Sequence, residues 1–435
     1  MFKEILKKIG LISFTTVCIL STAASCSLNP FNSEPKVIGT MGIIKQDPVV
    51  DANKFGYINA VKLLNGEVAP TALNDSPIIK IKQIDAQTLF ALTRGKGVFF
   101  TQNGGVDWNR IYIYPVDFVE EKPGKISAAT LAQLTKNDAT LITDFWVNPN
   151  DISVIYVAAN EGGVAKIFKT IDGGGNFVNV YSEVNAGTSV DKVLIDPKNS
   201  NHVYALLNKN ALIQTLDGGN TWLKTEDYTK DKDDKIVQID ILPELNTFYI
   251  VFEKGGVAIS TDGQKWIPQK LTKFDPVKYK EAQDQQAQQT AQDKLNGVIG
   301  GGTNFVNDFL GRLDSFETYK KIIPIPGKQT LQQKPFLLLA DESLWYSSDI
   351  SKPFTQIKNI PVQESKINIL DATVNPSKGL DEIYIAIGNK VLVSQNRGQS
   401  WKMKDLGVLN PANISQIQID QTNPEVIYIG LTDAG

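Results

Sequence analysis

The sequence predicts an all-β fold, a seven-bladed β-propeller with two helical insertions on one face. Two observations support this prediction. A short glycine-containing motif recurs with a unit of about 45 residues, and alternating apolar segments with Asn-Pro or Asp-Pro turns precede its copies. Alternation with β-branched residues is typical of strands, and such dipeptides are typical of turns. Four short strands in each unit of this length are the pattern of a propeller blade.

The motif consists of Ser or Thr, any residue, Asp or Asn, a glycine, and an aromatic residue shortly after. Clear copies begin at Thr101, Thr170, Thr215 and Ser260, and weaker copies begin at Ser347 and Ser394. The spacings between their starts are 69, 45, 45, 87 and 47 residues, so two intervals contain insertions. The polar positions are Asn103, Asp172, Asp217, Asp262, Asp349 and Asn396, and tryptophans follow at Trp108, Trp222, Trp266 and Trp401.

A structural role for these residues follows from the chemistry of a tight turn. Glycine tolerates positive φ, and an Asp or Asn side chain can accept hydrogen bonds from amides inside its own turn. The tryptophans are expected to pack between blades. Calcium binding or catalysis by the carboxylates is the alternative, but one copy in each blade is too many for one active site.

These copies are similar to Asp-box repeats, also called bacterial neuraminidase repeats. Residues 37–435 therefore resemble the Asp-box propellers, which include the photosystem II assembly-factor family, the sortilin ectodomain and the sialidases. The resemblance implies a propeller but no particular function, because enzymes and non-enzymes share this fold. Sialidases need an arginine triad, and the whole chain has only Arg94, Arg110, Arg312 and Arg397.

The predicted blades begin near Ile78, Leu141, Val190, Ile236, Ile322 and Ile367. The seventh blade has only two C-terminal strands, within 416–420 and 426–430. We expect segments 41–47 and 55–63, near the N-terminus, to supply its other two strands. Closure by both ends of the chain would remove an open sheet edge.

The N-terminal segment resembles a bacterial lipoprotein signal. Three lysines precede a short apolar run, and small residues lead to Cys26. The resemblance implies a signal peptide over residues 1–25, lipidation of Cys26 and a tether over 26–36. The expected location is then outside the cytoplasmic membrane, with a lipid anchor in the cell envelope. An ordinary secretory signal or an uncleaved anchor is the alternative.

The composition excludes several classes of protein. The formal net charge is −3, whereas nucleic-acid binders usually carry a concentrated basic surface. One histidine, His202, and two cysteines cannot form a zinc site of the Cys/His type. We expect no metal, no cofactor and no nucleic-acid partner, and we place His202 in a surface turn.

Insertions are expected at 115–140 and 268–321. Segments 126–138 and 276–295 are helix-prone, and a further helix at 304–316 would place Phe305, Phe309, Leu313 and Phe316 on one face. Insertions rising from one face would form a clamp for a partner over the central channel. Alternatively, the Phe/Leu face packs back on the propeller.

Polar residues recur at matching positions of the predicted inner strands: Asp144, Lys192, Gln238, Asp371 and Gln416. One interpretation is a ligand site at the channel mouth, with Asp144 and Asp371 as paired carboxylates of a glycosidase. The other is a hydrated channel with polar walls. We favour a non-enzymatic scaffold or assembly factor that binds an unknown protein, and assign no catalytic residue. The alternative is a glycan-binding or glycoside-hydrolase propeller.

Overall fold

The computed structural model describes residues 41–46, 55–57, 60–62, 68–70, 73, 76–122, 125–185, 187–225, 234–242, 245–296, 313–327, 334–361, 368–404, 406 and 412–433. The predicted signal peptide (1–25), Cys26, the tether (26–36), Phe305 and Phe309 lie outside these residues. Among the described helices, none combines the length and the apolar character that a membrane crossing requires.

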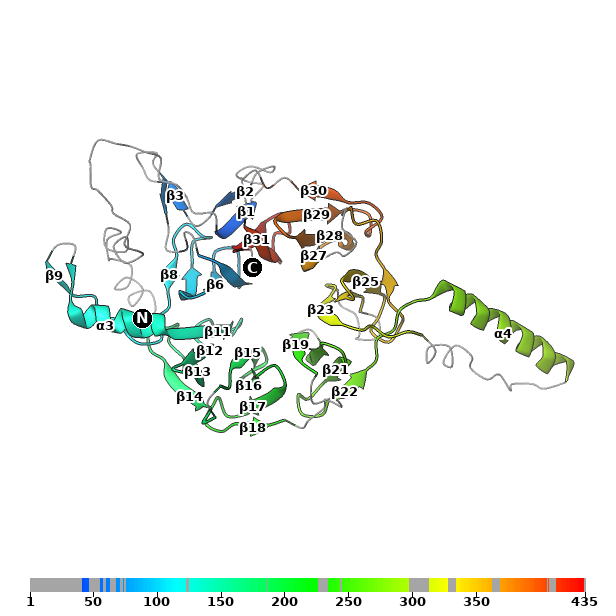
Figure 1. Cartoon of the computed structure of the whole chain (residues 1–435), viewed down its shortest axis with the longest axis horizontal. Coiled ribbons are helices and arrows are strands. Elements are labelled where there is room, and N and C mark those ends of the chain that lie inside the picture. Colours follow the sequence, from blue (N-terminus) through cyan, green and yellow to red (C-terminus); the bar gives the residue numbers. More distant parts are fainter. Residues whose placement is uncertain are drawn as a thin grey trace.

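The described strands form a ring of seven four-stranded antiparallel sheets, which confirms the seven-bladed propeller (Figure 1). Blade 1 consists of β5 (Ile78–Gln83), β6 (Leu89–Thr93), β7 (Gly97–Thr101) and β8 (Asn109–Arg110). Blade 2 consists of β11 (Thr140–Val147), β12 (Ile155–Glu161), β13 (Val164–Thr170) and β14 (Val178–Ser182). Blade 3 consists of β15 (Val190–Asp196), β16 (Asn199–Leu207), β17 (Ala211–Thr215) and β18 (Leu223–Lys224). Blade 4 consists of β19 (Ile236–Leu242), β20 (Thr247–Phe252), β21 (Gly256–Ser260) and β22 (Ile267–Gln269). Blade 5 consists of β23 (Tyr319–Pro324), β24 (Phe336–Ala340), β25 (Ser343–Ser347) and β26 (Thr355–Gln356). Blade 6 consists of β27 (Ile369–Asn375), β28 (Gly379–Ile387), β29 (Lys390–Ser394) and β30 (Lys402–Lys404).

The seventh blade combines both ends of the described chain. Its inner strands are β31 (Asn413–Ile419) and β32 (Ile427–Thr432), and its outer strands are β1 (Gly42–Gln46) and β2 (Phe55–Tyr57). β1 pairs antiparallel with β32, and Ile44 lies opposite Ile429. The ring is therefore closed by backbone hydrogen bonds between segments almost 400 positions apart in the sequence.

The hydrophobic core lies between the blades. Seven buried clusters are present in the described chain, and each joins two neighbouring blades. The cluster between blades 7 and 1 includes Tyr428, which is fully buried, and Trp108, which is 5% exposed. Because every blade shares apolar side chains with both neighbours, the ring is expected to be stable only as a whole.

Two helices lie in the insertions, as predicted. α3 (Ala128–Ala139) begins at Ser127, whose hydroxyl accepts a hydrogen bond from the Thr130 amide. α4 (Pro276–Leu295) begins after Asp275, which accepts hydrogen bonds from the amides of Val277 and Lys278. Ser and Asp are favoured helix N-caps, and proline is favoured at the first helical position. Two small hairpins, β3 (Ala60–Lys62) with β4 (Val68–Pro70) and β9 (Glu120–Lys122) with β10 (Lys125–Ile126), stand outside the blades.

Figure 1 shows α3 and α4 on opposite sides of the ring, with α4 pointing away from it. Neither helix lies over the centre of the ring in this view, so the described residues form no clamp over a channel. The expected arrangement therefore needs correction. A helix at the outer rim is free to extend outward, because the connection that carries it joins an outermost strand to the next innermost strand.

The predicted second insertion is also too wide at both ends. β22 continues to Gln269 and β23 begins at Tyr319, so both strands extend into the predicted range. Leu271 is buried, and a bridge pairs Thr272 with Ser315. Leu313 and Phe316 are each only 3% exposed, and the Phe316 ring lies 5.0 Å from that of Trp345. These two side chains are therefore part of the buried interior and are not available as a partner surface. The alternative, in which they pack back on the propeller, is what the structure shows for them.

Candidate functional site

The innermost strands share one local irregularity that positions a polar side chain. In every blade a register shift leaves one extra residue near the start of the innermost strand. A bulge of this kind re-aims the next side chain. The residues that follow it form what we call the inner ring: Lys80, Asp144, Lys192, Gln238, Lys321, Asp371 and Gln416.

The sequence identified five of these seven positions and missed Lys80 and Lys321. Both lie in segments with adjacent or alternating lysines, IIKIKQ and YKKIIP, which read as ordinary strand alternation. Aligning Ile78–Ile81 with Val190–Val193 would have revealed the shared pattern of an apolar residue, any residue, a polar residue and an apolar residue.

The two inner-ring carboxylates each join three blades. Asp144 accepts a hydrogen bond from Lys80 Nζ at 2.7 Å and from the Val193 amide at 3.0 Å. Asp371 repeats the arrangement, with Lys321 Nζ at 2.5 Å and the Ile417 amide at 2.8 Å. Each carboxylate thus bridges a lysine from the preceding blade and a backbone amide from the following blade.

The two glutamines of the inner ring each bind the backbone of the next blade, and Gln238 Nε2 also donates to the Tyr249 hydroxyl at 3.2 Å. Gln238 accepts from the Ile322 amide at 2.9 Å and donates to the Ile322 carbonyl at 3.2 Å. Gln416 forms the same pair of hydrogen bonds with Ile81 in the next blade. An innermost strand is a sheet edge whose backbone groups need partners, and these side chains provide them.

The hydrogen bonds of Asp144 and Asp371 test the prediction that these two residues form a pair of catalytic carboxylates. Asp144 and Asp371 are only 1% and 4% exposed, and each already accepts two hydrogen bonds. Asp144 contacts blades 1 and 3, whereas Asp371 contacts blades 5 and 7. Their sets of partners do not overlap, so the structure gives each carboxylate a separate structural role and shows no shared site between them.

Two lysines of β5, Lys80 and Lys82, lie over the ring of Trp146 on β11, and the charge of Lys192 on β15 also acts on Lys80. Lys82 Nζ lies 4.4 Å from the Trp146 ring centroid, and Lys80 Nζ lies 5.1 Å from it. Burial lowers the pKa of Lys80, and the charges of Lys192 and Lys82 lower it further while Asp144 raises it. Burial likewise lowers the pKa of Lys82. The positive charges of this cluster are therefore close enough to destabilise one another.

The recurring motif forms a closed hydrogen-bonded turn in each copy. Asp217 is representative: it accepts from the Thr215 hydroxyl at 2.7 Å, the Thr221 amide at 2.9 Å and the Thr221 hydroxyl at 2.6 Å. The Thr221 hydroxyl is the main cause that lowers the pKa of Asp217 to about 2. Equivalent bonds are made by Asn103, Asp172, Asp262, Asp349 and Asn396. These oxygens are engaged within their own turns.

The aromatic residues after the turns pack on the preceding blade. Trp222 Nε1 donates to the Val180 carbonyl at 2.9 Å, and the Trp266 ring lies 6.4 Å from that of Tyr204. Trp108 lies in the cluster between blades 7 and 1, and Trp401 packs against the cluster between blades 5 and 6. The motif thus couples a turn in one blade to the core that this blade shares with the preceding blade.

His202 requires a correction. It lies within strand β16, not in a surface turn, and is 7% exposed. Its Nε2 lies 3.1 Å from Gln214 Oε1, and the centroid of its ring lies 4.6 Å from that of the tilted Tyr204 ring. The turn is shorter than predicted because pairing with Asp196 begins at Asn199.

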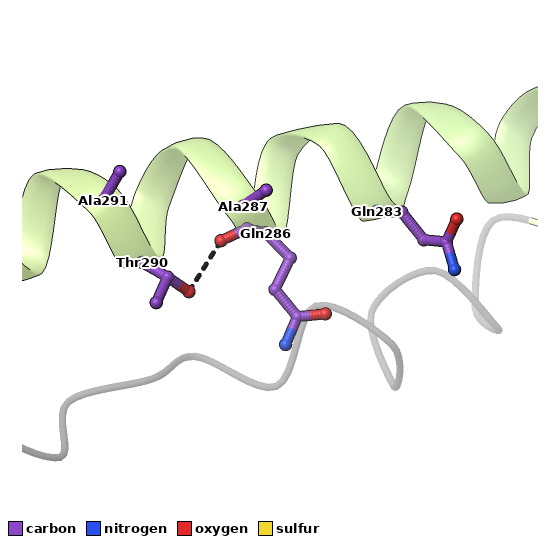
Figure 2. A pocket seen from close by; sticks show the side chains of 5 residues that line it. All are labelled: Gln283, Gln286, Ala287, Thr290 and Ala291. Carbon is purple, nitrogen blue, oxygen red and sulfur yellow. Dashed lines mark hydrogen bonds between the residues drawn. The ribbon is translucent and has the colours of Figure 1, made fainter.

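The described chain offers little else for chemistry. Within it, no group of three or more His, Cys, Asp and Glu side chains could hold a metal ion. A shallow pocket along α4 is lined by Gln283, Gln286, Ala287, Thr290 and Ala291, none of which titrates (Figure 2). Thr290 uses its hydroxyl to bond the Gln286 carbonyl of the same helix at 2.8 Å.

Known structures share this architecture at low sequence identity. YCF48 from Cyanidioschyzon merolae matches with a TM-score of 0.52 and 13% identity, over 82% of this chain and 95% of its own. The GH74 xyloglucanase from Xanthomonas campestris matches with 0.54 and 12%, and the GH74 enzyme from Niastella koreensis with 0.51 and 14%. This chain covers 51% of each GH74 enzyme. No protein-family model and no curated protein sequence matches the chain. The predicted resemblance to assembly-factor propellers is thus confirmed as a likeness of fold, which YCF48 and GH74 enzymes share.

Proposed function

We propose that this protein is a non-enzymatic, membrane-anchored scaffold outside the cytoplasmic membrane, and that it binds another protein through α4. The observation that carries the proposal is the position of this 20-residue helix, which extends away from the ring (Figure 1). Its contacts with the described ring lie at its base.

The base of α4 is held by a backbone hydrogen bond, an ion pair and an aromatic contact. The Lys273 amide donates to the Asp314 carbonyl at 2.8 Å, and Lys278 Nζ lies 3.3 Å from the Asp314 carboxylate. The rings of Phe274 and Tyr279 pack in a tilted arrangement, with 5.6 Å between their centroids. Val277, in the first turn of α4, is 64% exposed, and Leu295, at its far end, is 80% exposed. Most helical stability in proteins comes from packing of one helix face rather than from intrinsic propensity, so a projecting helix is better explained by a partner that packs on it.

The experiment compares two forms of the chain that both keep the ring. Because Thr272 pairs with Ser315, a short Gly-Ser linker can replace residues 276–312 without removing the buried Leu271 or Phe316. We expect a partner that co-purifies with the complete chain, and then binds it as a purified protein, to lose binding at least tenfold on replacement.

A matched pair of point variants isolates the helix itself. Ala287→Pro interrupts α4, whereas Ala287→Ser leaves it intact. Binding should fall in the proline variant and persist in the serine variant. Equal partner affinity in the complete chain, the linker form and both point variants would reject α4 as the binding element.

The alternative is a glycan-binding or glycoside-hydrolase propeller that uses Asp144 and Asp371. The likeness to GH74 enzymes concerns the fold alone. Hydrolysis needs two carboxyl groups on one bond, about 5–10 Å apart. The bonding of these two residues to different blades favours the scaffold. Release of reducing sugars from xyloglucan by the wild type, with loss in both Asp144→Asn and Asp371→Asn, would instead support the alternative.

A further inference from the structure

Three lysines lie on the innermost strands of blades 1 and 3, and the charges of Lys82 and Lys192 both act on Lys80. Lys80 is paired with Asp144 at 2.7 Å. The other oxygen of Asp144 accepts from the Val193 amide, and Val193 directly follows Lys192. One carboxylate therefore lies between two lysines from blades on either side of it.

Lys82 and Lys192 have no hydrogen bond or ion pair with a carboxylate among the described residues. Asp240 acts on Lys82 through its charge only, and its Oδ1 accepts from the Ile241 amide at 2.9 Å. Three ammonium groups thus share two carboxylates, which leaves an excess of positive charge around the Lys80–Asp144 pair.

The cluster can be reached by solvent. The Lys80 side chain is 19% exposed, and Lys82, Trp146 and Lys192 are all half-buried. The face of Trp146 is already covered by two ammonium groups, so it offers a poor stacking surface for a sugar ring. Half-buried cations attract anions more strongly than fully solvated ones do, because the local dielectric is lower.

We propose that Lys82, which lies over Trp146, and Lys192, which precedes the residue whose amide binds Asp144, form a binding site for a small oxyanion beside the Lys80–Asp144 pair. Phosphate and carboxylate groups share the required chemistry, because each offers several negatively charged oxygens to ammonium donors. The bound oxyanion would accept hydrogen bonds from both lysines and offset their mutual repulsion. This site is independent of α4 and of any protein partner.

Calorimetry with inorganic phosphate and with succinate, at constant ionic strength set with sodium chloride, tests the proposal and separates the two classes of oxyanion. We expect at least one to bind the wild-type chain, and the affinity to fall about tenfold or more in Lys82→Gln and in Lys192→Gln. Lys402→Gln, at an exposed lysine of β30, is the matched control and should bind as the wild type does.

Either lysine variant alone suffices if the other fails to fold, and removing a charge from a repulsive cluster is not expected to unfold the ring. A second readout is thermal unfolding, in which the effective oxyanion should raise the midpoint of the wild type more than chloride does. No binding of either anion to the wild type, or equal affinity in all four proteins, would overturn the proposal.

Discussion

Gln416 and Ile81 close the ring through a pair of hydrogen bonds between residues 335 positions apart. The Ile81 amide donates to Gln416 Oε1 at 2.7 Å, and Gln416 Nε2 donates to the Ile81 carbonyl at 3.1 Å. One side chain therefore takes the place of a missing neighbour strand where blade 7 meets blade 1. Together with the pairing of β1 and β32, it holds the two ends of the propeller together.

Replacing Gln416 by Ala should lower the free energy of unfolding by about 1–3 kcal/mol. The reason is that the amide and the carbonyl of Ile81 would both lose their partner in a part-buried position. Urea denaturation measures the change. Gln264→Ala is the matched control, since Gln264 is exposed in a turn and should change stability by less than about 0.5 kcal/mol. Equal losses in the two variants would contradict the role of Gln416.

Gly263 should not tolerate a side chain, although Gly95 should. Both residues have positive φ, +70° and +85°, so alanine carries similar backbone strain at either position. A Cβ atom at Gly263 would lie 1.4 Å from the hydroxyl oxygen of Tyr204, which is fully buried, whereas no atom lies within 4 Å at Gly95.

We therefore expect Gly95→Ala to cost about 1 kcal/mol and Gly263→Ala to cost at least about 2 kcal/mol more. Thermal unfolding of the two variants, compared with the wild type, gives the difference. Similar midpoints for both variants would show that blades 3 and 4 do not meet at this turn.

The pH dependence of stability should depend in part on Asp217. Hydrogen bonds from Thr221 and Thr215 lower the pKa of this carboxyl to about 2, from an ordinary value of 3.8. Because the folded pKa is depressed, the ionised carboxylate stabilises the fold fully above about pH 4. This contribution is lost as the pH falls toward 2.

Asp217→Asn cannot titrate, and asparagine already serves the equivalent turns at Asn103 and Asn396. We expect the stability of the variant, measured by urea denaturation at pH 5 and pH 3, to fall less between these values than that of the wild type. An identical fall in both proteins would show that the turn does not favour the charged form of Asp217.

The proposed lipid anchor makes a simple prediction about the two cysteines. Cys26→Ser should move the protein from the membrane fraction to the soluble fraction or leave the precursor uncleaved, since lipidation requires the thiol. Cys18→Ser is the matched control and should remain membrane-bound, because Cys18 belongs to the predicted signal peptide. Fractionation with mass spectrometry of the mature N-terminus measures both. An unmodified Cys26 on the wild-type protein would refute the anchor.

Much of the architecture could be predicted because its signals are local. The motif turns depend on hydrogen bonds within about four residues, as between Asp217 and Thr221. Helix α4 was predicted over its whole length because Asp275, Pro276 and an uninterrupted polar stretch define it without outside help.

The sequence by itself thus determined the blades, their number and the two helices. Only the tertiary structure decided which side chains meet at the centre of the ring, where a bulge shifts the alternation by one residue and a partner lies in another blade. Lys80 and Lys321 were missed for this reason. His202 was misplaced, and the choice between the two readings of Phe316 stayed open, because burial depends on neighbours distant in sequence. Local hydrogen bonding specifies each turn and helix, whereas charge balance and burial arise only once seven sheets surround a common axis.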